Sequence, residues 1–336
     1  MNARVAAILV LLLAVLGGAA LLSQRQDAAR QPDAGALGQP LLKGLKAADV
    51  AAIRIVEPGA TLTLKRKDDG WTIAERGEFP ASLATVRDFV LKAIELKAGQ
   101  SEALGEKDRA RLQLDASATQ VEFQGADGKP LARMLVGKKY FKRDPDDPAK
   151  APADGRFVLL PEAPERVFIV ADPLAQAAAQ SRLWIDRTAF KIEKVGTLEL
   201  RHPDGSGWRI ERSGDNADWK LAGGAPAGMK LDTSRANAAS YMLSQLELAD
   251  VAAPGAKDTG LDAPTLIRAT TLGGARYEIK VGKLAGDDYF VSFTSSADDA
   301  KEKALAQHVL LVPKSKLEDT LRKRDEMLEK VQPAGK

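Results

Sequence analysis

The sequence predicts an α+β fold in which an N-terminal transmembrane helix precedes two tandem repeats of a mostly antiparallel sheet with helices. Three features support this: one long uncharged apolar segment, short runs of alternating apolar and polar residues, and a motif order that recurs after Leu45. We expect four parts. They are an anchor at 1–23, a tether at 24–43, a first repeat with a connecting helix at 44–190, and a second repeat with a C-terminal helix at 191–331.

The predicted anchor is Val5–Leu22, which contains no charged or hydrogen-bonding side chain. As a helix it would be about 27 Å long, close to the thickness of a bilayer's hydrocarbon core. With Arg4 on the cytoplasmic side, the rest of the chain would enter the periplasm from the bacterial inner membrane. A signal peptide cleaved near Gly18-Ala19-Ala20 stays open as an alternative. The apolar run continues to Leu22 and is longer than a usual signal core, which favours an uncleaved anchor.

Composition limits the remainder of the chain. About 310 residues follow the anchor, enough for two ordinary domains. The 49 Lys and Arg and 46 Asp and Glu residues are interspersed and give a net charge of +3, which argues against a nucleic-acid partner. The absence of cysteine excludes disulfides, thiolate metal sites, thiol nucleophiles and a lipoprotein anchor. Gln24–Gly35 has no aromatic or β-branched residue, which is typical of a flexible tether.

Each predicted repeat opens with two strands of alternating polarity. The first has Ile53–Glu57 and Leu62–Lys65, and the second has Leu198–Arg201 and Trp208–Glu211. Proline and glycine between the paired strands predict tight turns, and a tryptophan, Trp71 or Trp219, follows each pair. Two related copies explain this match better than chance does.

The match continues through the rest of each predicted repeat. Amphipathic helices are expected at Ser82–Lys97 and Thr233–Ala249. Hairpins then turn at Asp127-Gly128 and Gly273-Gly274 and return through Val-Gly-Lys sequences. The closing elements are two strand pairs and two helices: Phe157–Leu160 with Val167–Val170, Tyr289–Phe293 with Val309–Val312, Pro173–Arg187 and Ser315–Val331.

These motifs resemble the bacterial domain-of-unknown-function family related to the auxiliary component of gliding-motility-type ABC transport systems. The resemblance covers about Leu45–Lys330, and its most specific piece is Gly260-Leu261-Asp262-Ala263-Pro264. The corresponding Leu112–Ser117 lacks the glycine and the proline, so the first repeat is divergent. The resemblance implies an inner-membrane anchor, a periplasmic domain and association with ABC transporter subunits, but no catalytic residue or cofactor.

Catalytic patterns are missing from the sequence, which predicts no enzyme and no metal or cofactor site. His202 and His308 have no second ligand at metal spacing. Gly137-Lys138 and Gly282-Lys283 lack the preceding glycine of a phosphate-binding loop. Asp258-Thr259-Gly260 occurs once, whereas an aspartic protease needs two such loops. The function we expect is a non-enzymatic binding or scaffolding module, accessory to an ABC-type transport system.

The candidate interaction surface combines a basic-aromatic run with two tryptophans: Lys138, Lys139, Tyr140, Lys142, Arg143, Trp184 and Trp208. A solvated strand end whose charge is balanced by the acidic residues after it is the simpler interpretation of the run. Two other functions stay open. One is an envelope hydrolase that uses carboxylates such as Asp115 and Asp262, and the other is a glycan or small-ligand module that uses Trp184 or Trp208 in a cleft between the repeats.

Overall fold

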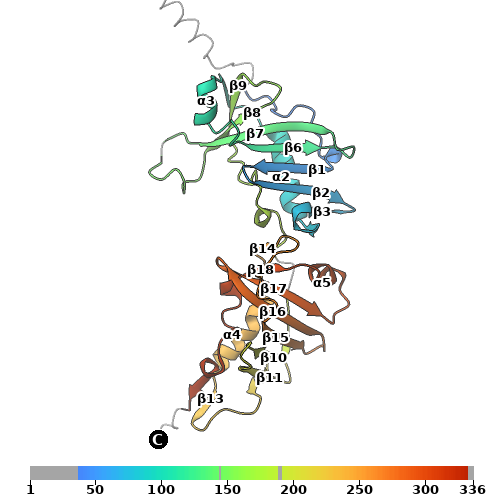
Figure 1. Cartoon of the computed structure of the whole chain (residues 1–336), viewed down its shortest axis with the longest axis vertical. Coiled ribbons are helices and arrows are strands. Elements are labelled where there is room, and N and C mark those ends of the chain that lie inside the picture. The colour runs from blue at the N-terminus through green and yellow to red at the C-terminus, as the bar shows by residue number, and fades with distance from the viewer. Residues whose placement is uncertain (1–36, 144, 188–190, 332–336) are drawn as a thin grey trace, which may run out of the picture. The chain divides into compact units, whose positions relative to one another are not determined.

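The computed structural model describes residues 37–143, 145–187 and 191–331, and the chain forms two compact units (Figure 1). Unit 1 comprises the described residues up to Thr63 together with Arg87–Ala179. Unit 2 comprises Leu64–Val86 and the described residues from Gln180 onward. The expected boundary at residue 190 falls in the gap 188–190, and the chain passes from unit 1 to unit 2 between Ala179 and Gln180.

The fold is mixed and rich in sheet, with few helices. One antiparallel sheet has nine strands in the order β4-β3-β2-β1-β6-β7-β8-β9-β5. Its strands are β1 Ala52–Glu57, β2 Ala60–Lys67, β3 Gly70–Ile73, β4 Phe79–Pro80, β5 Gln100–Ala103, β6 Thr119–Gln124, β7 Pro130–Tyr140, β8 Gly155–Leu159 and β9 Arg166–Val170.

The second large antiparallel sheet lies in unit 2 and has eight strands in the order β12-β11-β10-β15-β16-β17-β18-β14. These are β10 Val195–Arg201, β11 Gly207–Glu211, β12 Lys220–Leu221, β14 Asp250–Val251, β15 Thr265–Thr271, β16 Arg276–Ala285, β17 Asp288–Ser295 and β18 Leu310–Pro313. A separate two-stranded sheet pairs β13 Met229–Leu231 with β19 Leu328–Lys330.

The described helices are α2 Leu83–Glu95, α3 Glu106–Arg111, α4 Thr233–Ser244 and α5 Ala300–Leu305. The predicted N-terminus of α2 is confirmed, because the Ser82 hydroxyl accepts a hydrogen bond from the backbone N–H of Thr85 at 3.3 Å. In α4 the cap is Asp232, whose carboxylate accepts from the N–H groups of Ser234 and Arg235.

The core follows from alternation in the strands and helical periodicity in α2 and α4. In unit 1, Ile53 and Ile55 of β1 and Phe123 of β6 are fully buried on the face that α2 covers. Phe89 of α2 stacks on Phe123 with ring centroids 5.9 Å apart. The buried positions of the helices have the same spacing: Val86, Phe89, Val90 and Ala93 in α2, and Ala236, Ala239, Ser240 and Leu243 in α4.

The two Gly-Lys pairs that end the Val-Gly-Lys sequences are structural. Each lies in a β-bulge, where the register shifts between Val136 and Lys139 and between Val281 and Leu284. The Lys138 N–H donates to the Leu112 carbonyl, and the Lys283 N–H donates to the Thr259 carbonyl, both at 2.8 Å. These glycines therefore allow a loop to approach a strand closely.

The divergence of the Leu112–Ser117 motif has a measurable backbone consequence. Gln113 and Gly260 occupy corresponding places, one residue after the carbonyl that each bulge binds, and both have positive φ, 55° for Gln113 and 71° for Gly260. A glutamine pays a steric penalty in this left-handed region that a glycine does not.

We therefore expect Gln113→Gly to stabilise unit 1 by about 0.5–1 kcal/mol, because the relief of strain exceeds the added freedom of the unfolded chain. Gln113→Ala, which retains a Cβ atom, is the matched control and should leave stability unchanged. Urea unfolding measures the difference, and equal midpoints for the glycine and alanine variants would contradict the strain.

The connecting helix predicted at Pro173–Arg187 is wrong. The structure has only a 3₁₀ turn there, at Ser181–Leu183. The Asp172 carboxylate accepts the Leu174 N–H at 2.6 Å, but this contact belongs to a turn and no helix follows it. Leu174 then adopts a φ of 46°, which ends helical continuation at once. The apolar residues of the segment are buried instead through an irregular path, so tertiary packing overrides helix propensity.

The C-terminal helix predicted at Ser315–Val331 is also wrong. The chain forms 3₁₀ turns at Lys314–Lys316 and Arg324–Met327 and then enters β19. Thr320 lies in this irregular segment, where it is fully buried and its hydroxyl donates to the Ala239 carbonyl of α4 at 2.7 Å. Contacts with α4 therefore hold the segment without a regular helix.

The end of the predicted tether belongs to the folded part of unit 1. Leu41 and Leu42 are buried, and the Leu41 N–H donates to the Leu96 carbonyl at 2.7 Å. Residues 24–36 and the predicted anchor Val5–Leu22 lie outside the described residues. Within the described residues, none of the helices has the length and apolar character needed to cross a membrane.

Candidate functional site

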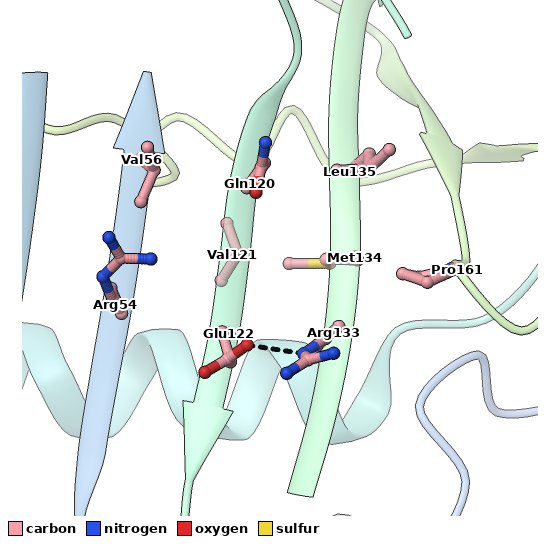
Figure 2. A pocket seen from close by; sticks show the side chains of 9 residues that line it. All are labelled: Arg54, Val56, Gln120, Val121, Glu122, Arg133, Met134, Leu135 and Pro161. Carbon is pink, nitrogen blue, oxygen red and sulfur yellow. Dashed lines mark hydrogen bonds and ion pairs between the residues drawn. The ribbon is translucent and has the colours of Figure 1, made fainter. Parts of the chain in front are cut away.

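The face of the nine-stranded sheet opposite α2 carries a hollow of about 340 Å³ in unit 1 (Figure 2). Alternation along the strands positions its side chains, because Val121 and Met134 turn toward the core while their neighbours turn outward. The outward-facing residues are Arg54 and Val56 of β1, Gln120 and Glu122 of β6, and Arg133 and Leu135 of β7, with Pro161 completing the rim.

Three charges form a row across the hollow. Arg54 is directly opposite Glu122 on the neighbouring strand, and Glu122 is opposite Arg133. The dashed line in Figure 2 marks the hydrogen bond that the Arg133 Nε donates to one oxygen of Glu122. Its length is 2.5 Å, and the Gln124 amide donates to the other oxygen at 2.5 Å. Chiefly the Gln124 hydrogen bond, and then Arg133, lowers the pKa of Glu122.

This geometry suits binding better than acid–base chemistry. Both oxygens of Glu122 already accept hydrogen bonds, and its lowered pKa keeps the carboxylate ionised at neutral pH. The Arg54 guanidinium makes no hydrogen bond or ion pair within the part of the chain that the structure describes. Arg54 can therefore bind an incoming carboxylate, while Val56 and Leu135 offer apolar contact beside it.

The corresponding strands of unit 2 have the opposite order of charges. Glu199 of β10, Arg268 of β15 and Glu278 of β16 are directly opposite one another in sequence across the sheet. Arg268 lies 3.6 Å from Glu199 and 2.9 Å from Glu278, and the Glu278 hydrogen bond is the main cause that raises the pKa of Arg268. Each charge of this row is paired, so the available guanidinium of Arg54 is particular to unit 1.

The residues of the expected basic-aromatic surface lie at the end of β7, away from the hollow's lining. Lys139 donates to the carbonyls of Ala149 and Ala151 at 3.0 and 3.1 Å. Tyr140 packs edge to face on Phe157, with centroids 5.7 Å apart. These two residues support their own loop, whereas Lys138, Lys142 and Arg143 are exposed.

The two expected surface tryptophans are interior residues. Trp184 has none of its surface exposed, and Trp208 has 3%. The Trp208 indole N–H donates to the Arg322 carbonyl at 2.7 Å. The expectation of exposed stacking surfaces does not hold for these side chains, because their large apolar rings are used in packing.

Asp115, one of the two carboxylates considered for hydrolysis, stabilises the turn in which it lies. It accepts from the Ser117 N–H at 3.0 Å and the Ser117 hydroxyl at 2.6 Å, and this hydroxyl bond is the main cause that lowers its pKa. Asp262 is exposed in a turn of unit 2. The described residues contain no group of three or more His, Asp or Glu side chains arranged to hold a metal ion.

The residues of the hollow carry no recognisable motif, and the sequence alone does not single them out. Their only signal is the polar half of an alternating strand, which every half-exposed strand has. Pairing between β1, β6 and β7, separated by up to about 80 positions along the chain, is what assembles the row.

Comparison with known proteins adds a family assignment. No curated protein and no solved structure matches the chain. The family described as a domain of unknown function (DUF4340) matches residues 71–264, from β3 to the turn before β15. The match spans more than half of the 336 residues, and the family's description assigns no activity. The chain therefore belongs to the DUF4340 family.

Proposed function

We propose that this protein is a single-pass inner-membrane protein whose periplasmic part is a non-enzymatic binding or scaffolding module, accessory to an ABC-type transport system. The observation that carries the binding role is the hollow around Arg54 on an exposed sheet face. Its available guanidinium and apolar neighbours suit an acidic segment of a partner protein, with a carboxylate at Arg54 and apolar side chains beside Val56 and Leu135.

We infer that the two sheets with their helices are tandem copies of one module. In both, the first strand of the opening hairpin lies beside the second strand after the helix, as β1 lies beside β6 and β10 beside β15. The short strand directly after the helix forms an edge in both sheets. The equal spacing of buried helix residues and the two Gly-Lys bulges support the same inference.

The membrane placement is inferred from the sequence. Val5–Leu22 is apolar throughout and long enough for a bilayer's core, and Arg4 precedes it. Periplasmic exposure would bring the sheet face of unit 1 within reach of envelope proteins. Recovery of the full chain in the cytosolic fraction would contradict this placement.

Photo-crosslinking tests the docking surface. A benzoylphenylalanine introduced at Gln120, on the rim of the hollow, should crosslink to a defined protein partner in intact cells, and mass spectrometry of the adduct should identify a transporter subunit. The matched position is Arg87, exposed on α2 and therefore on the opposite side of the sheet.

The Arg54→Glu change should reduce the Gln120 adduct at least about tenfold, since it replaces attraction for a carboxylate with repulsion. The same reversal at Lys92, exposed on α2, should not. Equal adduct patterns from Gln120 and Arg87, or an adduct indifferent to Arg54→Glu, would contradict docking in the hollow. If the adduct identified a single partner unrelated to transport, the proposed binding role would stand and the proposed transport role would be contradicted.

A further inference from the structure

A second hollow, of about 430 Å³, lies entirely within unit 2 and has a different chemistry. Three segments form it: the start of β10 with the residues before it, the loop between β11 and β12, and one face of α4. Its size is within the range of small-molecule sites. The residues that define its chemistry are Arg212, Trp219, Asn237, Ser240, Tyr241 and Ser244.

Aromatic side chains form part of the lining. Tyr241 projects from α4 with 63% of its surface exposed, which is high for so large a ring. Trp219 is held in place, because its indole N–H donates to the Asn237 side-chain oxygen at 3.0 Å. The Arg212 guanidinium lies 4.7 Å from the centre of the indole. The hollow therefore combines a fixed indole with an exposed phenol ring.

The charges around this hollow cancel. The Arg212 guanidinium makes three hydrogen bonds, to the Val195 carbonyl at 2.8 Å, to the Asp215 carbonyl at 2.5 Å and to the Asp215 carboxylate at 2.9 Å, and this carboxylate neutralises its charge. The remaining lining charges, Glu193 and Lys194, are adjacent and opposite in sign. A charged ligand would therefore find no unopposed partner here.

Neutral hydrogen-bonding groups remain available beside the aromatic rings. The Asn237 amide uses its oxygen for Trp219, which leaves the two N–H donors of its side chain. The Ser244 hydroxyl donates to the Tyr241 carbonyl at 2.8 Å and can still accept. The Ser240 hydroxyl makes no hydrogen bond within the described part of the chain. A purely apolar ligand would leave these groups desolvated and unpaired, which is costly.

From these observations we propose that unit 2 binds a neutral saccharide in this hollow. The C–H face of a sugar ring packs against the exposed Tyr241 ring, and the sugar hydroxyls exchange hydrogen bonds with Asn237, Ser240 and Ser244. A neutral saccharide matches the three properties of the hollow: its aromatic rings, its balanced charge and its free hydrogen-bonding groups. The site belongs to unit 2 and the Arg54 hollow to unit 1, so it does not depend on the protein partner proposed for unit 1.

An oligosaccharide array that carries neutral and acidic sugars tests the proposal. The full chain is applied in a detergent without a sugar headgroup. We expect binding to neutral sugars, and Tyr241→Ala should weaken it about tenfold or more through loss of aromatic packing. The matched control is Leu91→Ala, which shortens the exposed residue at the corresponding position of α2 and should leave binding unchanged.

The oligosaccharide that binds best is then titrated free in solution. Binding of this short sugar would show that a long glycan chain is not required. Tryptophan emission should change in the wild type, and Trp219→Phe should remove most of that change. Failure of every neutral sugar to bind, binding confined to acidic sugars, or undiminished binding by Tyr241→Ala would each overturn the proposal. None of these results bears on the Gln120 crosslink, so the two proposals fail separately.

Discussion

Gly282→Ala should destabilise unit 2 by about 3 kcal/mol, because the new methyl group has no space. A Cβ atom at this position would lie 2.1 Å from the Thr259 carbonyl oxygen. That oxygen accepts the Lys283 N–H at 2.8 Å, so relief of the clash requires the loss of this hydrogen bond or a shift of the bulge. The obstacle is backbone, which cannot rotate away as a side chain can.

Thermal unfolding followed by circular dichroism checks this expectation. A loss of about 3 kcal/mol corresponds to a Tm lower by roughly 6–12 °C for a unit of this size. Gly214→Ala is the control, since a Cβ atom there meets nothing within 4 Å. Gly137→Ala should repeat the effect in unit 1, where the Cβ atom would lie 2.4 Å from the Leu112 carbonyl oxygen. Equal Tm values for the Gly282 and Gly214 variants would contradict the steric argument.

Trp184→Ala should cost about 3–5 kcal/mol, the range for loss of a large aromatic side chain from a core. Trp184 is completely buried, and its backbone is held as well. The Trp184 carbonyl accepts from the Ser82 N–H at 2.6 Å, and the next residue, Ile185, forms an isolated antiparallel bridge with Ala81. The segment has no α-helix to hold it, so it depends on these backbone bonds and on the buried side chains, of which the Trp184 indole is the largest.

Two further variants sharpen this test. Trp184→Phe retains most of the apolar contact and should lose markedly less stability than Trp184→Ala. Tyr241→Ala removes an aromatic ring of similar size from the surface and should change stability by less than about 0.5 kcal/mol. Urea denaturation gives the free energies of unfolding. An unchanged midpoint for Trp184→Ala would mean that the indole does not hold this segment.

Local signals in the sequence are sufficient to predict most of the strands in the two large sheets. The strands predicted at Ile53–Glu57 and Trp208–Glu211 are confirmed as β1 and β11, and the turn at Asp127-Gly128 joins β6 to β7. Period-two alternation and turn residues act over a few positions, so one sequence suffices to read them. The short edge strands β5 and β14 carry neither signal, since they form by pairing with β9 and β18.

A favourable N-cap residue predicts a helix start at both Ser82 and Asp172, and only the prediction at Ser82 is correct. Ser82 begins α2 as expected, and Asp172-Pro173 begins no helix at all. Both segments bury residues at helical spacing, and after Asp172 these are Leu174, Ala177, Ser181, Trp184 and Ile185. The difference is that Leu174 has a φ of 46°, and the later residues pair with Ala81 and Ser82 instead of continuing a helix.

The sequence by itself determined the sheet-rich α+β class, the main hairpins and the two amphipathic helices. Only the tertiary structure decided which side chains are accessible. It buried Trp184 and Trp208, exposed Tyr241, and brought Arg54, Glu122 and Arg133 into one row. The reason is physical: strand and turn preferences are local, whereas a binding surface is made by residues whose separation along the chain only strand pairing and core packing can close.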